Sequence, residues 1–273
     1  MPGVLCYPER GGGAGLGDRW YVFTCLVNWA WALNATVWVD PPCKMLSKEH
    51  NYGRPLDCNI TWDRYFDVTP SHLFMNPANG PGCTLELPEY YHSFLSQLHN
   101  AFPSTASWPL PGGLNGPPGT EKPSVKRSSF AIEEASKLSK DMGLPREYDM
   151  IHIRRTDANN ECDTNVERMV NMLKRRTFAT THVIYATDER DANYNNPLIQ
   201  TLQNRNLTVH VPYSWLDGRF PRDNYMVYSI EQYLFEHAVK QHQWRRGFSC
   251  PSAEGDGRSQ QPIYASMRPP AAP

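Results

Sequence analysis

Between residues 149 and 240, short apolar runs alternate with helical patterns, and this alternation constrains the fold more than any other feature of the sequence. Three runs have the length of buried strands: 149–153, 183–186 and 207–211. Three segments show helical patterning: 163–177, 197–204 and 224–240. Strands and helices in regular alternation predict an α/β fold with a doubly wound parallel sheet.

A second α/β unit is predicted near the N-terminus. A short strand at 4–7 precedes the glycine-rich loop 11–17, and a helix at 18–33 leads into a strand at 35–39. The apolar stretch 20–39 has the length of a membrane span, but asparagine and threonine interrupt it. We therefore predict a buried helix and a strand here, and no membrane span.

Proline and glycine separate the two halves. Residues 103–123 contain six prolines and four glycines, a density that neither a helix nor a strand tolerates. A further helix is predicted at 131–142. The sequence thus predicts four parts: an N-terminal half at 1–102, a linker at 103–130, a C-terminal half at 131–244 and a poorly ordered tail at 245–273.

Composition excludes several classes of function. Lys and Arg total 27 against 28 Asp and Glu, so no overall positive charge is available to bind nucleic acid. The seven cysteines form no C-x-x-C pair, which removes support for a zinc ribbon. No Asp-x-Asp pattern is present to hold Mg²⁺ or Mn²⁺ against a diphosphate. We expect neither a nucleic-acid partner nor a metal cofactor.

The compartment is suggested by three N-x-[ST] sequons, which begin at Asn34, Asn59 and Asn206. Three cysteines in one loop-rich region could pair under oxidising conditions: Cys43, Cys58 and Cys83. Residues 1–10 contain no basic start followed by an apolar run. The expected location is the lumen of the endoplasmic reticulum or Golgi if the natural N-terminus carries a signal or anchor, and the cytoplasm otherwise.

The glycine-rich segment 11–19 is the first candidate site, because backbone N–H groups at the start of a helix can bind an anion. The dinucleotide fingerprint G-x-G-x-x-G cannot be placed on it. A Walker A motif fails as well, since Asp18 and Arg19 stand where Lys and Ser or Thr are needed. The alternative is a tight turn that binds no ligand.

Two further candidate sites follow predicted strands, where parallel sheets bind ligands. His152-Ile-Arg-Arg-Thr-Asp157 places Arg154 and Arg155 at a strand end, where planar guanidinium groups can bind phosphate; the alternative is a structural pair with Asp157. Asp188 follows the next strand and could accept hydrogen bonds from a ribose or a base. There the alternative is a helix N-cap at Thr187 or Asp188.

Four blocks, in order along the chain, carry a resemblance to a known family. They are Gly-Leu-Gly-Asp-Arg at 15–19, the H-x-R-R-x-D motif at 152–157, Ile-Tyr-Ala-Thr-Asp at 184–188 and the helix 229–238. Together they resemble the fucosyltransferase superfamily that includes the alpha-1,6-fucosyltransferases and the protein O-fucosyltransferases. The H-x-R-R-x-D block is the most specific of the four.

This resemblance implies a GT-B-like fold of two Rossmann-like halves and an enzyme that transfers fucose from GDP-fucose with inversion, without a metal. It implies that Arg154 and Arg155 bind the donor diphosphate and stabilise the departing GDP. The implied donor-binding set is Gly15, Gly17, His152, Arg154, Arg155, Asp157, Asp188 and Glu231. A general base would come from the N-terminal half, where Glu9 and Asp18 are the candidates. The acceptor would be a glycan or a glycoprotein hydroxyl.

One departure from the family leaves alternatives open. After its last helix the family has a strand and a serine-rich turn that closes over the donor phosphates, whereas 239–247 here is polar and unlike it. The C-terminal half is therefore expected to be incomplete relative to the family. The first alternative is a catalytically inactive relative that binds a nucleotide sugar or a glycan. A second is an unrelated Rossmann-like phosphate binder.

Overall fold

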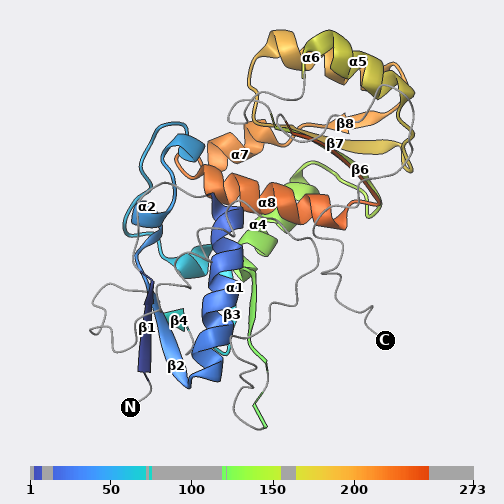
Figure 1. The fold of residues 1–273 in the computed structure, drawn as a ribbon. Coiled ribbons are helices and arrows are strands. Elements are labelled where there is room, and N and C mark those ends of the chain that lie inside the picture. The colour runs from blue at the N-terminus through green and yellow to red at the C-terminus, as the bar shows by residue number, and fades with distance from the viewer. Residues whose placement is uncertain are drawn as a thin grey trace. The chain divides into compact units, whose positions relative to one another are not determined.

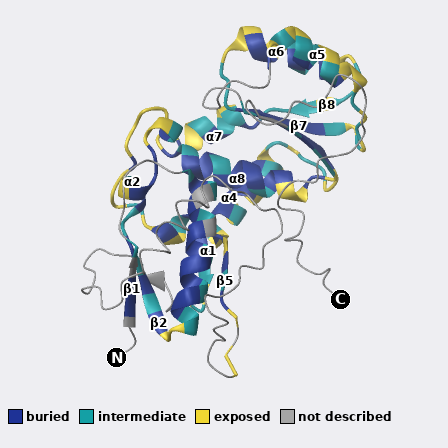
Figure 2. Cartoon of the chain, in the orientation of Figure 1, coloured by how far each residue is buried: buried dark blue, intermediate teal, exposed yellow. Residues whose placement is uncertain are grey.

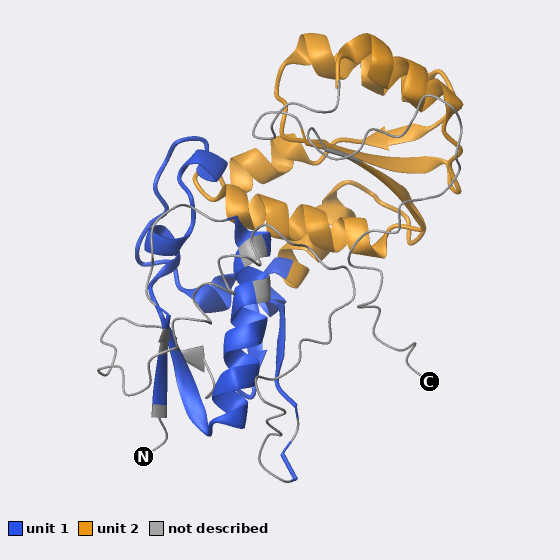
Figure 3. Cartoon of the chain, in the orientation of Figure 1, with its two compact units in different colours: residues 1–131, 260–273 blue, residues 132–259 orange. Residues whose placement is uncertain are grey.

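The computed structural model of the chain describes residues 3–7, 15–71, 74–75, 119–120, 122–154 and 164–245. The chain divides into two compact units, one formed by residues 1–131 with 260–273 and the other by 132–259 (Figure 3). Most of the predicted linker 103–130 and nearly all of the predicted tail 245–273 lie outside the described residues. Both units are mixed α/β structures with parallel strands, as the sequence predicts.

Unit 1 begins with a parallel strand–helix–strand arrangement. Strand β1 (Gly3–Tyr7) pairs with β2 (Ala35–Val39), and helix α1 (Leu16–Ala32) connects them. Strand β4 (Phe74–Met75) lies on the other side of β2. The predicted strands and helix are confirmed, with one correction: the helix begins at Leu16, so Gly17 belongs to the helix rather than to the glycine loop.

A second, antiparallel pair in unit 1 was not predicted. Strand β3 (Phe66–Thr69) pairs with β5 (Ser124–Arg127), so the end of the predicted linker is a strand. Three short helices lie between β2 and β3: α2 (Pro42–Met45), η1 (Glu49–Asn51) and η2 (Trp62–Arg64). A disulfide joins Cys43 to Cys58, and Cys83 lies outside the described residues.

Aromatic packing joins the two parts of unit 1. The Phe23 ring of α1 meets Trp62 edge-on, with ring centroids 4.6 Å apart, and Trp62 stacks on Phe66 at 6.0 Å. All three side chains are buried. Large rings in these geometries contribute packing free energy beyond the area that they bury. They therefore fix β3 against α1.

Unit 2 contains a four-stranded parallel sheet in the order β8-β7-β6-β9 (Figure 1). Its strands are β6 (Asp149–Arg154), β7 (His182–Thr187), β8 (Thr208–His210) and β9 (Lys240–Arg245). Its helices are α4 (Ser129–Asp141, which starts in unit 1), α5 (Val166–Arg175), α6 (Ala192–Gln203), α7 (Tyr213–Arg219) and α8 (Asn224–His237). The three strands and the helices predicted from the apolar periodicity are confirmed within a few residues.

Helices cover the sheet of unit 2 on both faces (Figure 1). Ile151, Val183 and Tyr185 face α5 and α6 in one apolar cluster. On the opposite face, the His152 ring packs edge-on against Phe235 of α8, a helix that is buried along most of its length (Figure 2). Burial on both faces explains why these strands read as continuous apolar runs.

Strand β9 was missed because its sequence is polar. The predicted helix 224–240 ends at His237, and the chain then pairs with β6 from Lys240 to Arg245. β9 is the outermost described strand beside β6, where polar side chains are tolerated. Among the described residues, no helix is long and apolar enough to cross a membrane.

Candidate functional site

The first part of the candidate site is the carboxyl end of β6, the strand between β7 and β9. His152 is buried on this strand, and half-buried Arg154 is its last residue. Ligands of open parallel sheets bind beyond strand ends of this kind. Arg155 and Asp157, which complete the predicted motif, lie outside the described residues.

The second part is the turn that follows β7. The Asp188 N–H donates to the Ile153 carbonyl at 3.4 Å, which keeps this turn beside the end of β6. One Glu189 carboxylate oxygen accepts from two successive backbone N–H groups, at 2.9 and 3.0 Å. The N-cap of α6 is Asp191, so neither Thr187 nor Asp188 caps that helix, but the Thr187 hydroxyl accepts from the Glu189 N–H at 3.1 Å within the turn.

Arg190 is an unpredicted member of this region. Its guanidinium donates to both carboxylate oxygens of Asp217, at 2.8 and 3.1 Å, and to the Thr187 carbonyl. The same group lies 4.9 Å from the centre of the Tyr213 ring. Arg190 thus ties α7 to the end of β7. The sequence signal that could have found Arg190 is its position, two residues after Asp188 at the end of β7.

Glu231 is the most unusual group of the region. It is buried in α8, and its Oε2 lies 3.9 Å from the His152 Nε2. Its other carboxylate oxygen is buried and has no hydrogen-bond partner among the described residues. An unpartnered buried carboxylate is costly, and such groups concentrate at functional sites.

Burial raises the pKa of Glu231 to about 8, an effect that the positive charge of Arg190 reduces and the carboxylates of Asp188 and Asp217 reinforce. The carboxyl group is therefore largely protonated in the ligand-free protein near neutral pH. Hydrogen-bond donors brought by a ligand would favour its ionised form. The described geometry thus brings together three predicted residues: His152, Asp188 and Glu231.

The predicted residues of the glycine segment belong to unit 1. Gly15 lies just before α1 and Gly17 lies within it, while the Asp18 side chain and Glu9 are outside the description. Arg19, the last residue of that motif, is buried and donates to the Met45 carbonyl through Nε at 3.0 Å and Nη2 at 2.7 Å. Its role in unit 1 is to hold α2 against α1.

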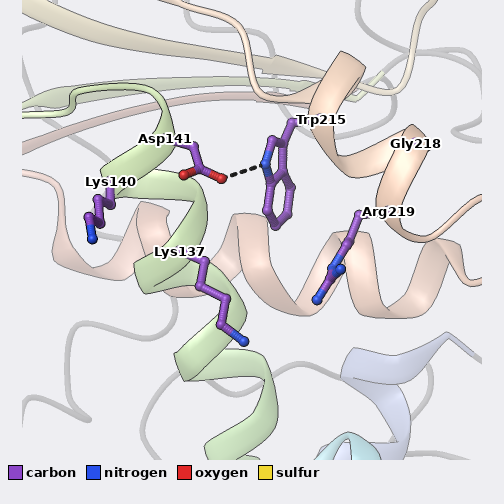
Figure 4. Close-up of a pocket in the computed structure, with 6 residues that line it drawn as sticks. All are labelled: Lys137, Lys140, Asp141, Trp215, Gly218 and Arg219. Carbon is purple, nitrogen blue, oxygen red and sulfur yellow. Dashed lines mark hydrogen bonds between the residues drawn. The ribbon is translucent and has the colours of Figure 1, made fainter.

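A separate pocket of about 560 Å³ lies between α4 and α7 (Figure 4). Its lining residues are Lys137, Lys140, Asp141, Trp215, Gly218 and Arg219. The Trp215 indole donates to Asp141 at 2.9 Å, and Glu134 accepts from Arg219 and from Lys137, each at 2.9 Å. The hydrogen bond from Arg219 is the main cause of the lowered pKa of Glu134, and this one carboxylate pairs with two of the pocket's cations. None of the predicted site residues is among those that line this pocket.

Neither a metal site nor a known relative defines the candidate site further. In the part of the chain that the structure describes, no three His, Cys, Asp or Glu residues are grouped to hold a metal ion. No family model matches the chain, and no match to a curated protein was found.

Proposed function

We propose that the chain is an inverting glycosyltransferase with a GT-B-like fold, which transfers fucose from GDP-fucose to a hydroxyl of a glycan or a protein. The observation that carries the proposal is the buried Glu231 carboxyl group, with an unpartnered oxygen, beside His152 at the carboxyl ends of parallel strands. The resemblance of the four sequence blocks supplies the choice of fucose.

Guanine is the base that best suits this carboxyl group. Its edge presents a ring N–H and an exocyclic amine side by side, and a carboxylate can accept both in parallel. Adenine offers the amine without the adjacent ring N–H, and uracil offers a single N–H between two carbonyls. Glu231 would therefore favour GDP over ADP or UDP.

The transfer step needs a cation at the diphosphate and a base at the acceptor. In the proposed step, the acceptor oxygen bonds to the anomeric carbon, the bond from that carbon to the diphosphate oxygen breaks, and GDP leaves. Arg154 and Arg155 would stabilise the departing charge. The acceptor proton would pass to a carboxylate, for which the sequence resemblance offers Asp18 or Glu9.

A second function, binding of a nucleotide sugar or a glycan without turnover, is favoured by the composition of β9. The strand follows α8, as in the family, but it reads Lys-Gln-His-Gln-Trp-Arg and supplies no serine or threonine hydroxyl. The serine-rich closure over the phosphates has no counterpart within this strand.

The deciding experiment is thermal unfolding of the full chain with GDP, ADP and UDP at millimolar concentration. We expect GDP to raise the melting temperature most, and Glu231→Gln to lose this shift because an amide cannot accept two N–H groups. Glu236→Gln, an exposed position on the same helix, is the matched control and should behave as wild type.

A wild-type protein that GDP does not stabilise would contradict the transferase and the nucleotide-sugar binder, and would leave only the glycan binder. Release of GDP from GDP-fucose in the presence of a glycoprotein acceptor separates them. Turnover supports the transferase, whereas a GDP-dependent shift without turnover with any acceptor supports the non-catalytic binder.

A further inference from the structure

All three N-x-[ST] sequons lie on the surface of the described chain. Their asparagines are exposed: Asn34, Asn59 and Asn206. Exposure is common among the described asparagines but not universal, since Asn51 and Asn195 are buried and donate through their carboxamides to backbone carbonyls, at 2.9 and 3.0 Å. Exposure therefore makes all three sequon asparagines accessible to a modifying enzyme, and the sequon itself distinguishes them from the other exposed asparagines.

Two of the sequons occupy the same position in the two units. Asn34 turns the chain from α1 into β2, and Asn206 turns it from α6 into β8. Both have positive φ, at 50° and 58°, a conformation that asparagine tolerates better than most residues. The turn alone therefore explains asparagine at these positions, but it leaves open what the exposed carboxamides do.

A turn that enters a parallel strand lies at the amino edge of its sheet. Asn34 and Asn206 are consequently at the edge opposite the strand ends where ligands bind. In unit 2 the candidate site follows β6 and β7, whereas Asn206 precedes β8. A bulky group at either asparagine would leave the carboxyl edge of its own sheet open.

The third sequon lies beside independent evidence of oxidising chemistry. Asn59 directly follows Cys58, which is bonded to Cys43. Disulfides form and persist in secretory compartments, the same compartments in which sequons are modified. The Asn59 carboxamide donates to the Asp57 carboxylate at 3.0 Å, on an exposed surface.

We infer that Asn34, Asn59 and Asn206 carry N-linked glycans. In the modification, the side-chain amide nitrogen bonds to the anomeric carbon of a lipid-pyrophosphate-linked oligosaccharide. The bond from that carbon to the pyrophosphate oxygen breaks, the lipid pyrophosphate leaves with the electron pair, and the amide loses one proton. The inference is independent of the donor that the protein binds.

A glycan at Asn206 has a structural consequence for unit 2. β8 is the outermost described strand beside β7, and Thr208 on it is exposed. Unpaired strand edges invite pairing with another chain. A glycan attached two residues before Thr208 would shield this edge.

The test is the mass of the full chain isolated from the cells that naturally make it. We expect a mass above that calculated for the polypeptide that these cells make. A peptide amidase that releases N-glycans should return it to the polypeptide value, with aspartate at positions 34, 59 and 206. If the mass before treatment equals that of the polypeptide, the inference is wrong. If one of the three positions remains asparagine after treatment, that position carries no glycan.

Matched variants at the hydroxyl residue separate glycosylation from the structural role of each turn. Thr36→Val and Thr208→Val keep a β-branched residue in the strand and remove the hydroxyl that the sequon needs, so each should lose one glycan. Thr36→Ser and Thr208→Ser keep the hydroxyl and should keep the glycan. If the valine and serine variants at one site carry the same glycan mass, the assignment of a glycan to that site is wrong.

Discussion

At the scale of single residues, the burial of Glu231 couples stability to pH. Its pKa is raised to about 8 in the folded protein from an ordinary value near 4.5, so the folded state retains a proton that the unfolded chain releases. Between these values stability therefore falls as pH rises, by at most about 1.4 kcal/mol for each pH unit. Glu231→Gln removes this loss and should be more stable than wild type at pH 8.

The measurement is chemical denaturation of wild type and Glu231→Gln from pH 4.5 to 8. We expect the two to have similar stability at pH 4.5 and to diverge steadily above it. Glu236→Gln should show no such divergence, because Glu236 is exposed. A constant difference between Glu231→Gln and wild type across this range would mean that Glu231 does not titrate there.

The arginine pair makes a second prediction at this scale. Arg155→Ala should lower kcat by about 100-fold or more if Arg155 stabilises the leaving diphosphate. The kcat of Arg155→Lys should be closer to that of Arg155→Ala than to that of wild type, because lysine keeps the charge and loses the planar fork. Arg175→Ala, at an exposed position near the end of α5, is the control. A lysine variant with wild-type kcat would show that only charge is needed.

At the scale of elements, the Cys43–Cys58 disulfide closes the loop that contains α2 and η1. A cross-link across about 15 residues stabilises a fold by roughly 3 kcal/mol through the unfolded chain. Cys58→Ser should therefore unfold at a lower denaturant concentration. The double variant Cys43→Ser with Cys58→Ser should match it, and reductant should lower wild type to the same level. Unequal stability of the single and double variants would show that the cysteines contribute separately.

How well an element could be predicted depended on its burial. β6 and β7 are buried on both faces and read as apolar runs, and α5 carries a clear apolar stripe, so their existence followed from the sequence. β9 is an edge strand of polar residues, and β3 with β5 is an antiparallel pair whose partners are far apart in the chain. Tertiary pairing creates these strands, and local periodicity does not reveal it.

Only part of the candidate site could be predicted from the sequence. His152 and Asp188 follow from the rule that ligands meet the carboxyl ends of strands. Glu231 came from the resemblance alone, since nothing in a helical pattern marks one carboxylate as buried. Arg190 and Asp217 meet through a long-range bidentate pair at 2.8 and 3.1 Å, which only the folded chain defines.

At the scale of the whole molecule, the source of positive charge at the diphosphate decides how the protein responds to chelators. The sequence has no Asp-x-Asp pattern, and the proposed reaction uses arginine instead of a divalent ion. Transfer of fucose by the full chain should therefore persist in EDTA. The check is initial rate with and without chelator, and loss of activity that Mn²⁺ restores would contradict the arginine-only arrangement.

The pairing of β6 with β9 has a consequence for how unit 2 is made. β6 is the first strand of its sheet along the chain, and the register places Asp149 opposite Lys240 and Arg154 opposite Arg245. One side of β6 can pair with β7 as soon as β7 has left the ribosome. The other side pairs with β9, which is made only after all the helices from α5 to α8. Closing so long a segment is slow relative to local pairing. Until synthesis passes residue 245, the strand that carries His152 and Arg154 is itself an open edge, so the nascent unit offers it for pairing with other chains.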